Sequence, residues 1–240
     1  GVLDNTFFGS NSMIGAGTFE NRGLVKNTSG SPIFNLNLIN SNGSFNVQTG
    51  SVWLRGGSSI NGTLTVDNGV VKLDGGTHTL ADGLVINGTG TVEVYRGTTT
   101  TAGAIDLNGN LKVLNSGLFQ LNHALNVDGT LNIAGGTLSM GASGSWNGGV
   151  GTVFWGSGTL VGDILNTSNM TINGTATLDS GTFTNQGTII WTGSDGTTQS
   201  QPIINAGAVF LNDTTGVLDN TFFGSNSMIG AGTFENRGLV

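Results

Sequence analysis

The sequence contains no cysteine, two prolines and two histidines in 240 residues. Without cysteine, neither disulfide bonds nor thiolate metal sites contribute to stability. Charged residues are also scarce, at 9% of the chain, and the formal net charge is −7. The seven basic residues are scattered: Arg22, Lys26, Arg55, Lys72, Arg96, Lys112 and Arg237. Binding to a phosphate backbone requires a clustered basic footprint, so we expect no nucleic-acid partner.

Long apolar runs are missing as well. No stretch approaches the roughly 18 apolar residues of a membrane-spanning helix, and no basic segment precedes a shorter apolar run as in a signal peptide. We therefore expect neither a membrane span nor an export signal within these residues. If the protein is exported, its signal lies outside them. No change of composition marks a domain boundary, which predicts one continuous unit.

Glycine is abundant, with 43 residues, and hydrophobic residues make up 36% of the chain and are spread evenly along it. Glycine-rich chains that lack apolar residues form linkers or stay disordered, whereas this apolar content is enough for a packed core. We therefore expect a folded protein.

A long repeat dominates the sequence. Residues Gly1–Val25 recur letter for letter as Gly216–Val240. Residues 1–215 are therefore one full period of a continuous structure, and residues 216–240 begin the next period. This predicts a tandem array, the alternative being a single period cut with a deliberate overlap. If 215 residues complete a whole number of coils, the second copy stacks in the same frame as the first, displaced along one axis.

A shorter motif recurs within the long period: glycine, a small residue, an apolar residue, any residue and a second apolar residue. Its nine copies begin at Gly43, Gly62, Gly90, Gly109, Gly129, Gly151, Gly174, Gly187 and Gly207. Most lie 19 to 28 residues apart, and the interval of 13 between Gly174 and Gly187 indicates a second strand of the same coil. A period near twenty residues indicates a solenoid.

Two architectures accommodate short strands separated by Asn-Gly and Asp-Gly turns: an antiparallel sandwich and a parallel β-helix. The alternation of apolar residues predicts strands, and nothing repeats at the helical period. A sandwich closes on itself and cannot continue through tandem copies. We therefore predict an all-β fold, a right-handed parallel β-helix (β-solenoid) with nine or ten coils per 215-residue period. Such a period advances about 45 to 50 Å along the axis.

The motif predicts which residues point inward. Its first apolar positions form a predicted core ladder of Phe45, Leu64, Val92, Leu111, Leu131, Val153, Ala176, Ile189 and Val209. The next residue of each motif then points outward, and in the last third of the chain three of these are large and apolar: Phe154, Ile190 and Phe210. An exposed apolar strip indicates a contact surface, here for lateral association of solenoids and joined by Phe7 and Phe8 or their copies. The alternatives are a slipped register or a covering loop.

Catalytic chemistry is sparse. His78 and His123 have no acidic residues at a metal-site or relay spacing. A turn role is expected for the aspartates that precede or lie near a glycine, which are Asp67, Asp74, Asp82, Asp128 and Asp195. Asp106 and Asp163 are the exceptions in strand-like positions. The glycine-aspartate nonapeptide of calcium-binding β-rolls is absent. We predict no catalytic residue, no metal and no cofactor, so the chain is not expected to be an enzyme. A polysaccharide-active β-helix is the least favoured alternative.

Asparagine is expected to form stacked amide ladders and turns rather than glycosylation sites.

Runs such as Asn61–Val66 (NGTLTV) and Val127–Leu138 (VDGTLNIAGGTL) resemble the passenger domains of bacterial autotransporters and the filamentous haemagglutinin-like adhesins. The resemblance implies a secreted right-handed β-helix and brings no catalytic residues. We expect the repeat unit of a bacterial cell-surface or extracellular fibre whose partner is itself. The alternative is the stalk of an adhesin whose tip binds glycans or surfaces.

Overall fold

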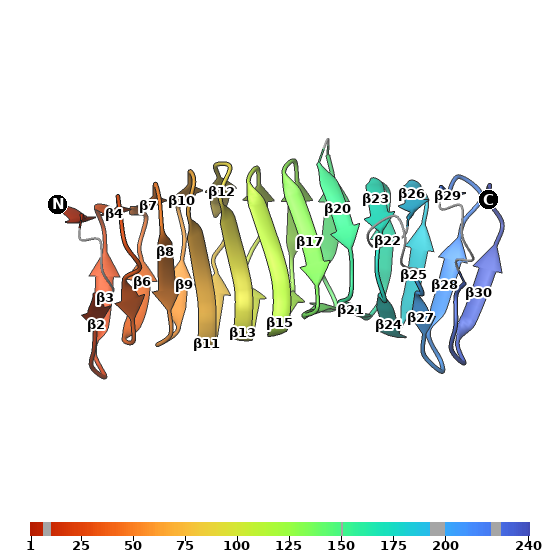
Figure 1. The fold of residues 1–240 in the computed structure, drawn as a ribbon, viewed down its shortest axis with the longest axis horizontal. Helices are drawn as coiled ribbons and strands as arrows, with labels where there is room; N and C mark the ends of the chain where they lie inside the picture. Colours follow the sequence, from red (N-terminus) through yellow and green to blue (C-terminus); the bar gives the residue numbers. More distant parts are fainter. Residues whose placement is uncertain (7–10, 150, 193–199, 222–226) are drawn as a thin grey trace.

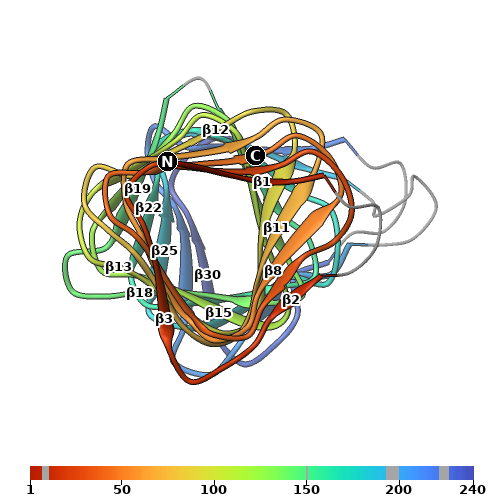
Figure 2. The same cartoon turned by 90° about the vertical axis from the view of Figure 1, so that its left-hand side faces the viewer.

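The chain folds into a single β-solenoid, shown by a computed structural model that describes residues 1–6, 11–149, 151–192, 200–221 and 227–240. These residues contain no helix, and every pairing between their named strands is parallel. Figure 1 shows the turns stacked along one long axis, and Figure 2 shows the three-sided coil seen from the N-terminal end. In Figure 2 the chain runs clockwise as it recedes, so the coil is right-handed, the hand that parallel crossovers favour.

Each of the first ten turns contributes a strand to each of three faces. The first face consists of β1 (Val2–Asn5), β4 (Leu24–Asn27), β7 (Ser44–Val47), β10 (Thr63–Val66), β12 (Val85–Asn87), β14 (Ile105–Leu107), β16 (Ala124–Val127), β19 (Ser145–Gly148), β22 (Ile164–Asn166), β25 (Thr182–Asn185), β28 (Val209–Asn212) and β30 (Thr233–Asn236).

The second face consists of β2 (Ser12–Met13), β5 (Ile33–Phe34), β8 (Ser51–Leu54), the first halves of β11 (Val70–Leu80), β13 (Thr91–Thr101) and β15 (Asn110–Leu121), then β17 (Thr130–Ala134), β20 (Thr152–Trp155), β23 (Asn169–Ile172), β26 (Thr188–Trp191) and β29 (Val217–Asn220).

The third face consists of β3 (Thr18–Asn21), β6 (Asn37–Asn40), β9 (Ser58–Ile60), the second halves of β11, β13 and β15, then β18 (Thr137–Met140), β21 (Thr159–Val161), β24 (Thr177–Ser180) and β27 (Ile203–Ile204). From β1 to β30 the chain completes about eleven turns. The predicted parallel β-solenoid is therefore confirmed.

Alternating side chains fill the interior of the coil. The predicted ladder residues Phe45, Leu64, Val92, Leu111, Leu131, Val153, Ala176 and Ile189 are all buried. Each buried leucine or valine contributes roughly 1.5 to 3 kcal/mol. They do not form one ladder, however: Phe45 pairs with Leu64 on the first face, whereas Val92, Leu111 and Leu131 are register partners on the second. The same five-residue motif occurs at more than one corner of the coil, so successive copies of the motif do not always stack on one another.

The prediction for the last copy of the motif was wrong by one residue. Val209 is only half-buried, while Ala208 and Phe210 are completely buried. A shift of one residue along a strand moves every side chain to the opposite face. The register of β28 is set by its pairing with β25, in which Phe210 lies beside Phe183 and Asn212 beside Asn185.

Glycine allows the turns to approach each other closely at the corners. A Cβ on Gly129 would overlap the carbonyl oxygen of Gly109, and a Cβ on Gly151 would overlap that of Gly129. These glycines form a column in which each residue lies against the backbone of the previous turn. The abundance of glycine is thus a packing requirement at these corners.

Replacing Gly129 by alanine is expected to lower the free energy of unfolding by about 1 to 3 kcal/mol, because the backbone of the neighbouring turn must shift. Gly17 is the matched control: its φ is not positive and a Cβ there meets no atom within 4 Å. The measurement is the denaturant midpoint of both variants. Equal midpoints for Gly129→Ala and Gly17→Ala would contradict the packing argument.

Candidate functional site

Buried asparagine side chains connect successive turns at one corner of the solenoid. The Nδ2 of Asn166 donates to the Oδ1 of Asn185 at 2.8 Å, and Asn185 donates to Asn212 at 2.8 Å. Asn212 in turn donates to Asn236 at 2.8 Å. The first three side chains are completely buried. This is the amide ladder that the sequence predicts, and it satisfies groups whose burial would otherwise cost about 1 to 3 kcal/mol each.

The same arrangement occurs at the N-terminal end of the chain. The Nδ2 of Asn21 donates to the Oδ1 of Asn40 at 2.5 Å, and Asn5 donates to Asn27 at 2.7 Å. Asn21 and Asn236 are the same residue of the repeated 25-residue segment. One copy therefore donates to the following turn, and the other accepts from the preceding turn.

Aromatic rings stack inside the coil beside the asparagine ladder. Phe183 lies 4.9 Å from Phe210 and 5.8 Å from Trp155 between ring centroids, and Phe210 lies 5.7 Å from Phe234. Phe210 therefore belongs to the core and not to the predicted lateral interface. The sequence carries a signal for this register, because Phe-x-Asn recurs at Phe19, Phe183, Phe210 and Phe234 with both residues on the same side of the strand.

The other two residues of the predicted lateral interface lie on the outer surface of the second face. Phe154 of β20 and Ile190 of β26 are both aligned with Thr171 of the intervening β23. Ile190 is 39% exposed and Phe154 is half-buried. Phe7 and Phe8 and their copies Phe222 and Phe223 lie outside the described residues. Of the predicted exposed apolar strip, the described residues therefore retain a short row of two, Phe154 and Ile190.

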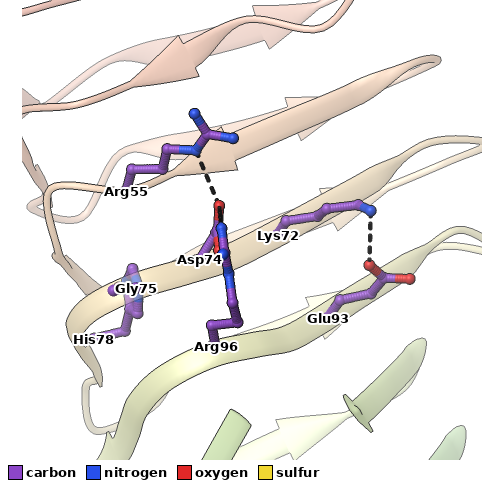
Figure 3. Close-up of polar contacts among 7 residues, drawn as sticks. All are labelled: Arg55, Lys72, Asp74, Gly75, His78, Glu93 and Arg96. Carbon is purple, nitrogen blue, oxygen red and sulfur yellow. Dashed lines mark hydrogen bonds and ion pairs between the residues drawn. The ribbon is translucent and has the colours of Figure 1, made fainter. Parts of the chain in front are cut away.

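A charged cluster that the sequence analysis missed connects three turns on the second face (Figure 3). The carboxylate of Asp74, whose side chain is fully buried, lies at an irregularity of β11. It accepts hydrogen bonds from Arg55 Nε at 2.9 Å and from Arg96 Nε at 2.6 Å. Burial alone would raise the pKa of Asp74, but the hydrogen bonds and charges of Arg96 and Arg55 outweigh it and hold the pKa below its usual value.

Lys72 forms the second part of this cluster. Its Nζ lies 3.3 Å from Glu93 and stands over the rings of Trp53, at 4.4 Å, and Tyr95, at 4.8 Å from the centroids. The residues of the cluster come from β8, β11 and β13, except that Arg55 directly follows β8. The spacing of Arg55, Asp74 and Arg96 matches the length of one coil. Basic residues scattered along the sequence are therefore stacked in space. Arg55 and Arg96 pair with Asp74, and Lys72 pairs with Glu93, so these ion pairs connect adjacent turns. We call Arg55, Asp74 and Arg96 the clamp.

The two histidines lie apart and in different environments. His78 is completely buried; its Nε2 donates to the carbonyl oxygen of Gly75 at 2.7 Å, and its Nδ1 accepts from the hydroxyl of Ser58 at 2.9 Å. His123 is exposed. Burial lowers the pKa of His78, against smaller opposing effects of Gly75 and Asp74. His78 thus serves as a neutral hydrogen-bonding residue of the core.

Stability is expected to fall as the pH drops below about 6.5, because an unfolded His78 takes up a proton there that the folded one resists. The measurement is the denaturant midpoint between pH 7.5 and 5.5. His78→Gln keeps a donor and an acceptor but cannot titrate, and should flatten this dependence. His123→Gln is the control and should keep it; loss of the dependence in His123→Gln alone would contradict the assignment.

The two aspartates predicted in strand-like positions both bind neighbouring turns: Asp106 lies in β14 as predicted, whereas Asp163 lies between β21 and β22 and not in a strand. Asp106 Oδ1 accepts from Asn126 Nδ2 at 2.7 Å, and Asp163 Oδ1 accepts from the backbone N–H of Thr182 at 2.8 Å. They lie on different turns, so they do not form a carboxylate pair. Within the described part of the chain, no three histidine, aspartate or glutamate side chains gather as metal ligands would.

Comparison with known proteins gives no relative. No protein-family model matches the chain, and searches of curated proteins and of solved structures find no significant match. None of the described residues forms a helix of the length and apolarity needed to cross a membrane. What the fold itself establishes is the class: a parallel β-solenoid with repeating turns.

Proposed function

We propose that the chain is the structural repeat unit of a long fibre in which the solenoid continues from one 215-residue period into the next. The observation that carries this proposal is the burial of the two identical segments: a residue that is exposed in one copy is buried in the other. Leu3 is 37% exposed whereas its copy Leu218 is 2% exposed, and Val25 is 4% exposed whereas its copy Val240 is 69% exposed. Each copy is covered on the side that the other leaves open, so that in an array the segment is covered on both sides.

The hydrogen-bond ladder supports the same conclusion. Asn212 donates to Asn236, and Asn21, the equivalent of Asn236, donates to Asn40. Superposing the equivalent residues gives an uninterrupted ladder from Asn166 to Asn40 of the next period. The aromatic stack continues in the same way, since Phe234 lies 5.7 Å from Phe210 and its equivalent Phe19 lies 6.0 Å from Phe34.

The first turn of the chain leaves part of the core uncovered. An apolar hollow of about 160 Å³ opens there between Leu3, Met13, Val25, Phe34 and Phe45. Exposed apolar surface and unpaired strand edges invite pairing with another chain segment. In the proposed fibre the last turn of the preceding period fills this hollow. The partner of the chain is therefore more of the same sequence.

The setting we propose is the surface or exterior of a bacterial cell. A cysteine-free solenoid built from stacked coils resembles the passenger domains named above, and its stability rests on the ladders and the core rather than on disulfide bonds. In this setting the fibre is a structural element and not an enzyme. Phe154 and Ile190 are the residues for lateral contact between fibres.

Rod length tests the proposal. Chains carrying one, two and four tandem copies of residues 1–215 are imaged by electron microscopy. We expect unbranched rods that lengthen by about 50 Å for each added period, the advance of ten stacked strands. Separate globular particles, or a length that does not grow with the number of periods, would overturn the proposal. Replacing Phe154 and Ile190 by serine should leave rod length unchanged and reduce side-by-side bundling, whereas replacing exposed Ser157 by alanine should change neither.

A further inference from the structure

The two identical segments lie in different sheets of the solenoid. β1 belongs to the first face and pairs with β4, whereas its copy β29 belongs to the second face and pairs with β26. Likewise β3 lies on the third face beside β6, whereas its copy β30 lies on the first face beside β28. Between equivalent residues the chain thus completes ten turns and one additional face. The condition of a whole number of coils in 215 residues is therefore not met.

The two copies nevertheless have the same internal structure. Val2 pairs with Leu24 in the first copy, and Val217 pairs with Leu239 in the second. The N–H of Leu24 donates to Gly1 and that of Leu239 to Gly216, both at 3.0 Å. The shift by one face is therefore a property of the whole period and not of a local rearrangement.

If the solenoid were an untwisted three-sided prism, one additional face would rotate each period about the long axis by a third of a full rotation relative to the preceding period. The figures show a different outcome. Both chain ends lie at the top in Figures 1 and 2, β1 lies at the top of Figure 2, and its copy β29 lies along the top of Figure 1. Figure 2 also places β3 and its copy β30 on the same side of the coil, although they belong to different faces.

The twist of the stacked strands explains this coincidence. Neighbouring strands in a sheet are rotated in a left-handed sense, by about 10° to 35° per strand, while the coil itself winds right-handed. Cancelling a third of a turn over ten turns needs about 12° per turn, at the low end of that range. The first face accordingly moves from the top at β1 to the left at β25 and β30 (Figure 2).

We propose that 215 residues is the length at which this twist cancels the additional face, so that successive periods are related by a translation of about 50 Å with almost no rotation. The inference rests on the proposed function. Its consequence is an interaction surface: every period presents the same residues in the same direction. The clamp of Arg55, Asp74 and Arg96, and the row of Phe154 and Ile190, recur in straight lines along the fibre. A parallel second fibre of the same chain can then make the same contact at every period.

The test uses a chain of six tandem periods with one cysteine in each, at exposed Ser143 in the turn between β18 and β19. The natural sequence has no cysteine, so a thiol-reactive gold label marks only this site. We expect the labels on one side of each rod, about 50 Å apart. Labels that return to the same side only at every third period would overturn the inference while leaving the fibre proposal intact.

A second measurement avoids the label. Cryo-electron microscopy of the unlabelled six-period rod gives the rise and the rotation per period. A rotation close to zero supports the translation, and a rotation near a third of a turn overturns it. If no continuous rod forms at all, the proposed function fails, and the inference fails with it. The two failures are thus distinguishable.

Discussion

Replacing Phe183 by alanine is expected to lower the free energy of unfolding by about 3 to 5 kcal/mol, the usual cost of removing a buried phenylalanine. Phe183 is completely buried and stands between Trp155 and Phe210, with Trp146 at 6.4 Å. No neighbouring side chain can fill the space, because the turns above and below are fixed by backbone pairing. Loss of the ring therefore removes three aromatic contacts and leaves a cavity.

The measurement is the denaturant midpoint followed by tryptophan fluorescence. Phe154→Ala is the control, because Phe154 is an outward-facing phenylalanine and only half-buried. We expect its cost to be well below that of Phe183→Ala. Similar losses in the two variants would contradict the assignment of Phe183 to the aromatic core.

Replacing Asn185 by alanine is expected to cost about 3 kcal/mol, because two buried amide groups lose a partner and each such loss costs about 1 to 3 kcal/mol. Asn185 accepts from Asn166 and donates to Asn212, and its Nδ2 also lies 3.1 Å from the carbonyl oxygen of Val217. The substitution interrupts the ladder at its centre. Asn166 and Asn212 remain completely buried on either side.

Asn108→Ala is the matched control, since Asn108 donates to Asn87 at 2.9 Å in an exposed ladder where water replaces the lost partner. Its expected change is within about 0.5 kcal/mol, as for most surface substitutions. Urea denaturation of the three proteins compares them directly. If Asn185→Ala unfolds at the same concentration as Asn108→Ala, burial does not strengthen the ladder.

Much of the fold was predictable because the interior of a solenoid imposes a period of two within strands and about twenty between them. Leu64, Val92 and Leu131 follow that pattern and are buried as predicted. Phe210 and Val209 do not, because the register of β28 is decided by its pairing with β25 and not by the preceding glycine. A one-residue shift is invisible in a local motif when both Val209 and Phe210 are apolar.

The charged cluster and the shift by one face escaped the sequence analysis for a common reason. Both depend on how many residues each individual turn contains. Arg55, Asp74 and Arg96 meet because two successive turns place them at the same corner, and β29 reaches the second face because the turns of one period add up to ten and a third. The number of residues per turn varies along the chain, so the position at which a given residue lies around the coil is known only from the structure.

The amide ladders also have a consequence for how a fibre grows. In the buried and half-buried ladders Asn5–Asn27, Asn21–Asn40 and Asn166–Asn185–Asn212–Asn236, each Nδ2 donates to the side chain of the following turn, whereas the exposed pairs Asn108–Asn87 and Asn147–Asn126 donate to the preceding turn. A rod built in this way is polar: one end offers amide oxygens to an incoming turn and the other offers amide hydrogens. Two like ends meeting would bring donor against donor or acceptor against acceptor. Joining is therefore head to tail, and all periods along one fibre point the same way.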